Sequence, residues 1–158
     1  MASPLREAVK SQFYPFMKAR DFVRAKSTSP LETVFRRLTP DKVQVCELQW
    51  EKYGRPSFVL NFGEGPIAGV EVHGIHVPAD EFHSYHSASL GSLQPRNGPH
   101  MRHWFRLKKP LLEAIASRSR WYDPDAVVAQ LIELFPEVEA WWSEKRPGPH
   151  LQFIRYAG

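Results

Sequence analysis

The sequence predicts a single α+β domain, in which an antiparallel meander sheet is packed by an N-terminal helix and C-terminal helices. Three observations predict it: an apolar stripe of helical period at the N-terminus, alternating strands joined by short turns, and helical patterns in the last third. Because strands and helices are grouped along the chain, the pattern favours α+β over a parallel βαβ sheet. The 158 residues, 42% of them hydrophobic, fit one domain spanning residues 1–158.

The first predicted element is a helix that begins at Ser3-Pro4 and ends near Ala19. A capping hydroxyl followed by proline is typical of a helix start, because the first helical position needs no N–H donor. The stripe that recurs at intervals of three and four comprises Leu5, Ala8, Val9, Gln12, Phe13, Phe16 and Met17. Pro15 lies within this stripe, so we expect the helix to be kinked there.

Strand character follows at residues 21–26, 31–38, 42–50 and 57–62. The turns at 39–41 and 52–56 are so short that the strands they join must pair as antiparallel neighbours. Alternation gathers six apolar residues on matching faces of the last two strands: Cys46, Leu48, Trp50, Phe58, Leu60 and Phe62. We expect these six to line the interior, with Cys46 a core residue rather than a nucleophile.

Residues 63–100 are predicted to form a long irregular insertion, because Gly and Pro recur every few residues and only 69–72 has strand character. Strand character returns at 101–107. Helices are predicted at 111–117, 124–135 and 137–145, the second of them capped by Asp123. Residues 150–156 are expected to close the sheet as an edge strand.

The run FYPFMKARDFVR at residues 13–24 joins a helix end to an Asp-Phe-x-Arg motif. Strand motifs follow at 33–37 (TVFRR), 45–52 (VCELQWEK) and 58–63 (FVLNFG). Together these stretches, about residues 13–63, resemble a bacterial family of uncharacterised domains, catalogued as a domain of unknown function. Asp21 stands where that family usually has glycine. The resemblance implies an α+β fold and a bacterial origin, and it implies no activity.

Composition and motifs exclude several classes of protein. The chain has one cysteine, so no internal disulfide can form, which is typical of a reducing compartment. No apolar run approaches the roughly 20 residues of a membrane helix, and Arg6, Glu7 and Lys10 interrupt the start where a signal peptide would be apolar. We therefore expect a cytoplasmic protein with no membrane partner. The glycine-rich, zinc-binding and nucleophile motifs of well-marked enzyme superfamilies are absent from the sequence.

Histidines form three pairs with the same spacing, at 73/76, 83/86 and 100/103. Residues three apart on a helical turn share a face and can present two imidazoles to one divalent metal ion. Only residues 80–86 lack the glycine or proline that would break such a turn. The candidate ligands are therefore His76, His83 and His86, with Asp80 or Glu81. The alternative is that these imidazoles are surface groups or pH-sensitive packing, so no metal cofactor is assigned.

Basic and aromatic residues recur together on the predicted strands and turns, within a chain of net charge +4. The candidate binding residues are Arg37, Lys52, Tyr53, Trp104 and Arg106. Such a surface binds single-stranded nucleic acid by stacking and phosphate contact. The alternative is that the aromatic rings belong to the core and the charges to the opposite, solvated face.

The favoured hypothesis is a small bacterial binding module without catalysis, which presents this charged aromatic face or the 63–100 segment to a protein partner. Neutralisation of a toxin is one form of such a role. Two alternatives remain open: a metal-dependent enzyme that uses the histidine-rich segment, and a nucleic-acid-binding domain. The sequence gives neither the partner nor the oligomeric state.

Overall fold

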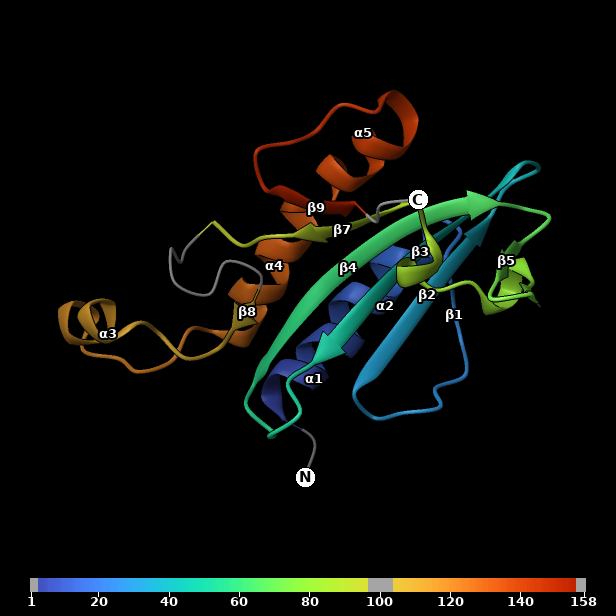
Figure 1. Cartoon of the computed structure of the whole chain (residues 1–158). Coiled ribbons are helices and arrows are strands. Elements are labelled where there is room, and N and C mark those ends of the chain that lie inside the picture. The colour runs from blue at the N-terminus through green and yellow to red at the C-terminus, as the bar shows by residue number, and fades with distance from the viewer. Residues whose placement is uncertain (1–2, 97–103, 156–158) are drawn as a thin grey trace.

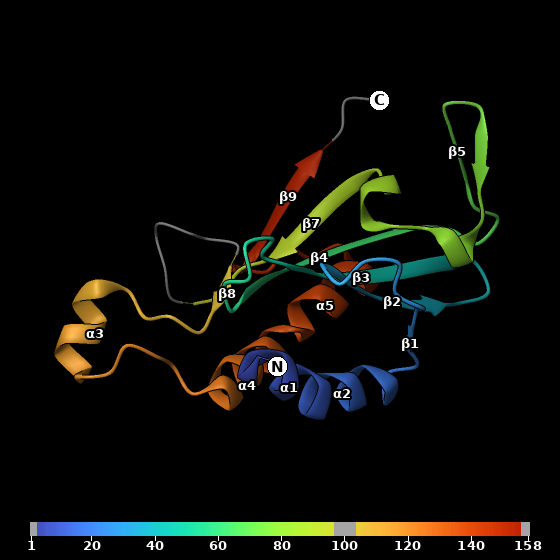
Figure 2. The ribbon, with the colours of Figure 1, turned by 90° about the horizontal axis from the view of Figure 1, so that it is seen from below.

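The computed structural model describes residues 3–96 and 104–155 of the chain. Within these residues, seven strands form the main sheet in the order β1-β2-β3-β4-β7-β9, and β8 also pairs with β4. Helices cover one face of the sheet, while a small hairpin and short turns lie over part of the other face (Figure 1, Figure 2). The predicted α+β architecture with an antiparallel sheet is confirmed.

Every strand pairing in the main sheet is antiparallel. The strands are β1 (Val23–Arg24), β2 (Glu32–Leu38), β3 (Lys42–Trp50), β4 (Ser57–Pro66), β7 (Ser89–Leu93), β8 (Phe105–Arg106) and β9 (Leu151–Arg155). The first four follow one another in space as in sequence, which is the predicted meander. Beyond it, β7 and β8 share the far edge of β4, and β9 closes the sheet as the predicted edge strand.

The helices are α1 (Pro4–Ala8), α2 (Tyr14–Lys18), α3 (Leu111–Ser117), α4 (Pro124–Leu134) and α5 (Pro136–Glu144). A π-helical turn, Val9–Phe13, joins α1 to α2, whose second residue is Pro15. There the N–H of Tyr14 donates to the carbonyl of Val9, five residues back. This wider turn explains how the helix continues past a proline that would clash with a regular α-helical turn.

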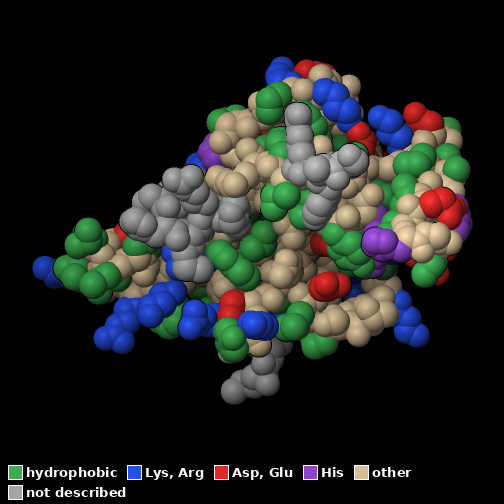
Figure 3. Space-filling model, viewed as in Figure 1, with side chains coloured by type: hydrophobic (Ala, Val, Ile, Leu, Met, Phe, Trp, Pro, Cys, Tyr) green, Lys and Arg blue, Asp and Glu red, His purple; other side chains and the backbone are tan. Residues whose placement is uncertain are grey.

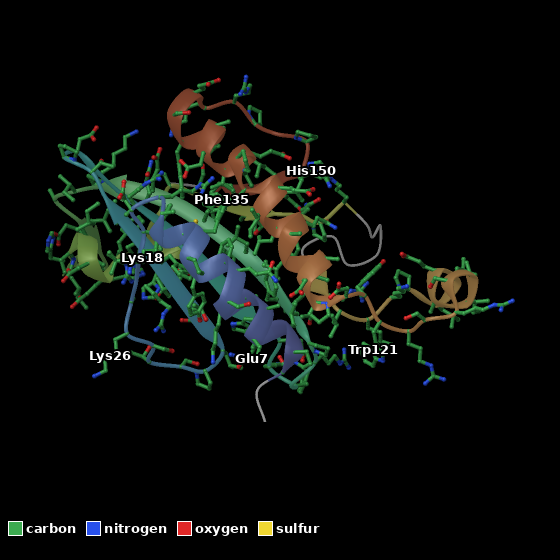
Figure 4. The ribbon with its side chains drawn as sticks, turned by 180° about the vertical axis from the view of Figure 1, so that it is seen from behind. Glu7, Lys18, Lys26, Trp121, Phe135 and His150 are labelled. Atoms are coloured by element: carbon green, nitrogen blue, oxygen red, sulfur yellow. The ribbon has the colours of Figure 1, made fainter. Side chains whose placement is uncertain are left out.

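The main core lies between the helices and the sheet. The six residues expected to line it, Cys46, Leu48, Trp50, Phe58, Leu60 and Phe62, are all at most 5% exposed. Phe135 lies where α4 meets α5, beside the N-terminal helix (Figure 4). Its ring makes edge contacts with Phe13, Phe16 and Phe22 at centroid distances of 6.2, 5.5 and 6.1 Å. Aromatic packing therefore joins the two ends of the chain.

The opposite face carries a second, smaller core, made of Val34, Val43, Val45, Ala79 and Phe82. It is covered by the hairpin β5 (Val70–Val72) and β6 (Ile75–Val77) and by the 3-10 turns Ala79–Glu81 and Ser84–His86. A Cβ at Gly65 would come within 2.6 Å of the Phe82 ring, so glycine lets this ring reach the sheet.

The predicted insertion at 63–100 is more regular than expected, since it holds the end of β4, this hairpin and all of β7. Of the strand expected at 101–107, residues 101–103 lie outside the described part, as do 97–100, and the described residues 104–107 hold β8. Among the described residues, no helix has the length and apolar character that crossing a membrane requires.

Candidate functional site

The candidate metal ligands do not meet at one point. His76 Nδ1 lies 2.6 Å from Glu71 Oε1, and His83 Nδ1 lies 2.9 Å from Glu47 Oε1. The backbone N–H of His83 donates to His86 Nδ1 at 2.9 Å. Across residues 3–96 and 104–155, no group of three or more His, Cys, Asp or Glu side chains could hold a metal ion. The third histidine pair, 100/103, lies outside the described residues.

Glu47 ties the histidine-rich segment to the sheet. Its side chain is 8% exposed and accepts hydrogen bonds from the Ser84 N–H at 2.9 Å and the Ser84 hydroxyl at 2.8 Å, besides the His83 contact. Burial alone would raise the pKa of Glu47, but these hydrogen bonds outweigh it and hold the pKa below its ordinary value. Because an ionised carboxylate only accepts, His83 carries its proton on Nδ1.

Next to the contact between Glu47 and His83, a groove runs along β2 between the β1–β2 connection and the first 3-10 turn. Its volume is about 310 Å³, and its lining residues are Ala25, Lys26, Ser27, Thr28, Glu32, Val34, Arg36, Asp80, Glu81 and His83. A hollow of about 510 Å³ adjoins it and shares Ala25, Lys26, Arg36 and Asp80. Of the candidate metal ligands, the structure therefore brings together His83, Asp80 and Glu81, around an arginine.

Arg37 lies on the helix-covered face of the sheet, where its side chain contacts neighbouring residues. Its guanidinium pairs with Glu139 at 2.8 Å, donates to Gln44 at 2.8 Å, and sits 4.4 Å from the centre of the Phe22 ring. Arg37 thus belongs to the contact between β2 and α5. It does not share a surface with the other candidate binding residues.

The aromatic rings near the candidate binding residues differ in burial. Trp50 is 5% exposed and its indole N–H donates to Thr33 at 3.2 Å, while the buried Phe105 ring stacks on Phe58 at 5.2 Å. Lys52 and Tyr53 lie in the β3–β4 turn, where the Lys52 ammonium is 4.9 Å from the centre of the exposed Tyr53 ring. Of the two candidate binding residues with aromatic rings, Tyr53 is therefore exposed, and Trp104 is half-buried.

Trp104 and Arg106 do share a surface. They line a hollow of about 610 Å³ together with Glu51, Arg55, Pro56, Ser57, Lys108 and Trp121. This hollow lies at the base of a projecting segment, residues 107–122, which we call the arm. Two of the five candidate binding residues therefore lie where the arm leaves the domain.

The arm is a hairpin closed by backbone hydrogen bonds, with α3 at its tip (Figure 1). The N–H of Tyr122 donates to the Leu107 carbonyl at 2.8 Å, and the N–H of Lys109 donates to the Arg120 carbonyl at 2.9 Å. Inside the arm, the Tyr122 hydroxyl donates to Glu113 at 2.5 Å. These bonds hold α3 in a defined position, although none of its residues is buried.

The arm surface is apolar with a basic rim. Leu111, Leu112 and Ile115 are 76%, 82% and 66% exposed, and Trp121 is 52% exposed. A hollow of about 690 Å³ on the arm is lined by Lys108, Lys109, Leu111, Ala114, Ile115, Arg118, Ser119, Arg120 and Trp121. Figure 3 shows hydrophobic side chains at this end of the molecule, with Lys and Arg gathered beside them. The helix at 111–117 is predictable from sequence, whereas no local sequence pattern predicts that its apolar side chains are exposed.

No family model, curated protein or solved structure matches this chain. The resemblance of residues 13–63 to a bacterial family of unknown function therefore stays a prediction.

Proposed function

We propose that this chain is a non-catalytic interaction module that binds an acidic protein partner through the arm, in the cytoplasm of a bacterium. One observation carries the proposal: α3 buries none of its seven residues, yet it holds three large apolar side chains in solvent. Clustered exposed apolar residues of this kind mark interaction sites on soluble domains.

Energetics support a covered state of the arm. A helix of seven residues is far too short to be stable alone in water, and within its own domain only Glu113 and Ala114 of α3 are half-buried while its other residues are exposed. Burying one leucine or isoleucine side chain contributes about 1.5–3 kcal/mol. A partner that covers Leu111, Leu112 and Ile115 would therefore stabilise the helix as it binds.

The charge of the rim selects the kind of partner. Lys108, Lys109, Arg118 and Arg120 line the arm hollow, and its lining includes no carboxylate. Glu113, the acid of α3, already accepts the Tyr122 hydroxyl. Two copies of the arm would bring like charges together, which disfavours self-association through this surface. An acidic surface with an apolar centre is complementary to it.

The two alternatives have less support. The described residues offer no grouped metal ligands. A stacking platform for nucleic acid would need several exposed rings on one surface, and of the rings near the base of the arm Trp121 is exposed, Trp104 is half-buried and Phe105 is buried. Because basic side chains lie beside Trp121, the experiment below is also designed to detect bound nucleic acid.

The test is site-specific photo-crosslinking in the organism that encodes the chain. A photoreactive amino acid replaces Leu112 at the arm or, as a control, Ile154 on β9, which is 55% exposed. We expect an acidic protein to be crosslinked from position 112 only. The variant Arg118→Glu/Arg120→Glu should weaken that crosslink, because it reverses the rim charge.

Equal crosslinks from both positions, or no protein crosslink from position 112, would overturn the proposal. Crosslinks from position 112 to RNA or lipid alone would also overturn it and would identify another class of partner. Purified complexes should dissociate more readily as ionic strength rises, since salt screens the exposed charges.

A further inference from the structure

The groove along β2 is separate from the arm. Lys26, in one wall of the groove, and Trp121, on the arm, lie well apart, on opposite sides of the N-terminal helix in Figure 4. We propose that this groove binds a small zwitterion, a molecule of the free amino acid class that carries both a carboxylate and an ammonium group. The site goes beyond the proposed interaction through the arm and does not depend on it.

The shape of the groove follows from the pleat of β2. Alternation turns Glu32, Val34 and Arg36 toward the face opposite to the helices, where they form the floor. The β1–β2 connection and the turn Ala79–Glu81 rise on either side. Volumes of about 310 and 510 Å³ for the groove and its adjoining hollow fall within the range of small-molecule pockets.

Arg36 supplies a positive group held in one orientation. Its Nε donates to the Phe82 carbonyl at 2.7 Å, which fixes the plane of the half-buried guanidinium. Burial lowers the pKa of Arg36 below its ordinary value, and the nearby acids Glu47, Asp80 and Glu81 offset this only in part. Among the described residues, no carboxylate lies within ion-pair distance of Arg36. A guanidinium oriented in this way suits a ligand carboxylate, which it can bind through two N–H groups.

Carboxylates supply the opposite charge. Glu32, Asp80 and Glu81 line the same groove, and their side chains make no hydrogen bond or ion pair to any residue in the described ranges. Unlike charges thus surround one groove without neutralising each other by direct contact. A dipolar ion satisfies both signs at once, with its carboxylate on Arg36 and its ammonium on Asp80 or Glu81.

His83 adds a ring nitrogen to the groove wall. Glu47 holds Nδ1 of this ring, so Nε2 is the nitrogen left for a ligand. An ammonium group donates three hydrogen bonds, and Nε2 of an imidazole without a proton at that position accepts one of them beside the carboxylates. A dianion would be repelled by the three acids, and a dication would leave Arg36 without a partner.

The test is a titration of the isotope-labelled full chain followed by amide NMR shifts. The probes are the common L-amino acids added singly, with succinate as a dianion and putrescine as a dication. We expect at least one amino acid to shift residues 25–28, 36 and 80–83, and succinate and putrescine to bind more weakly. Blocking either charged group of that amino acid, as the N-acetyl or the amide derivative, should weaken binding about tenfold or more.

Two variants and a control locate the site. Asp80 is exposed, so Asp80→Asn should keep the fold while weakening binding about tenfold. Arg36→Gln removes the group that binds the ligand carboxylate, so it should also weaken binding about tenfold. Glu71→Gln, which changes an exposed carboxylate outside the groove lining, should leave binding unchanged. Absence of shifts in the groove with every amino acid, or equal binding of succinate, would overturn the proposal, while the arm crosslinks would be unaffected.

Discussion

Glu47 and His83 are 36 residues apart in the chain, yet Glu47 Oε1 lies 2.9 Å from His83 Nδ1 on the face of the sheet opposite to the helices. The same carboxylate accepts two hydrogen bonds from Ser84. One buried acid therefore fixes the segment that follows the β5–β6 hairpin. Because Asp80, Glu81 and His83 form one wall of the groove, this acid also positions the proposed ligand site.

Replacing Glu47 should destabilise the fold. Glu47→Ala leaves the buried donors of Ser84 without an acceptor, and each unsatisfied buried polar group costs about 1–3 kcal/mol. We expect a loss of about 2–4 kcal/mol in the free energy of unfolding, measured by urea denaturation. Glu71→Ala is the matched control, because Glu71 also contacts a histidine but is 66% exposed. Equal effects of the two substitutions would contradict this role of Glu47.

Stability should depend on pH through the same carboxyl. The folded-state pKa of Glu47 lies below its unfolded value, because the hydrogen bonds from His83 and Ser84 outweigh burial. The stabilisation is therefore fully present above the ordinary glutamate pKa of about 4.3 and is lost as the pH falls through the lower, folded-state pKa.

Chemical denaturation from neutral pH to below pH 4 measures this dependence. Glu47→Gln keeps the shape of the side chain without the titrating group, so its stability should fall less steeply with acid than that of the wild type. Parallel curves for the two proteins would show that the carboxyl of Glu47 titrates alike in the folded and unfolded chain.

The elements that local patterns specify were predictable from sequence. The alternation in β3 and β4 places Cys46 and Phe58 in the core, and the Asp123 cap starts α4, where its side chain accepts from the N–H of Asp125. Strand β7 escaped prediction because Ser89–Leu93 has two leucines around a glycine. The reason for Gly91 is tertiary, since a Cβ there would lie 2.3 Å from the Phe62 ring.

The candidate sites were only partly predictable. The two-residue period of β3 that turns Cys46 and Leu48 inward turns Glu47 to the opposite face, but a later segment covers that face and buries Glu47. The three-residue histidine spacing suggested a shared metal, whereas His86 Nδ1 accepts the backbone N–H of His83 and the His83 ring contacts Glu47 instead. Exposure of Leu111 and Leu112 depends on where the arm projects. No local pattern encodes it.

A methyl group at Gly91 should destabilise the sheet by overpacking. Phe62 is 1% exposed, and its ring makes edge contacts with Trp142 and Phe153 at 6.0 and 5.8 Å, so it has little room to move. We expect Gly91→Ala to cost about 1–3 kcal/mol of unfolding free energy. In Gly91→Ala/Phe62→Leu the smaller side chain relieves the clash, so the double variant should lose less than the sum of the single losses. Strict additivity in this cycle would refute the proposed contact.

Truncation of the exposed leucines of α3 should leave the fold nearly unchanged. Leu111 and Leu112 are 76% and 82% exposed, so Leu111→Ala/Leu112→Ala removes almost no burial, and alanine favours a helix at least as well. We expect the unfolding free energy to change by about 0.5 kcal/mol or less. Leu131→Ala in α4 is the matched control, and because Leu131 is fully buried it should cost about 2–5 kcal/mol. A comparable loss in the arm variant would mean that these leucines stabilise the domain itself, and their exposure would no longer favour an interface.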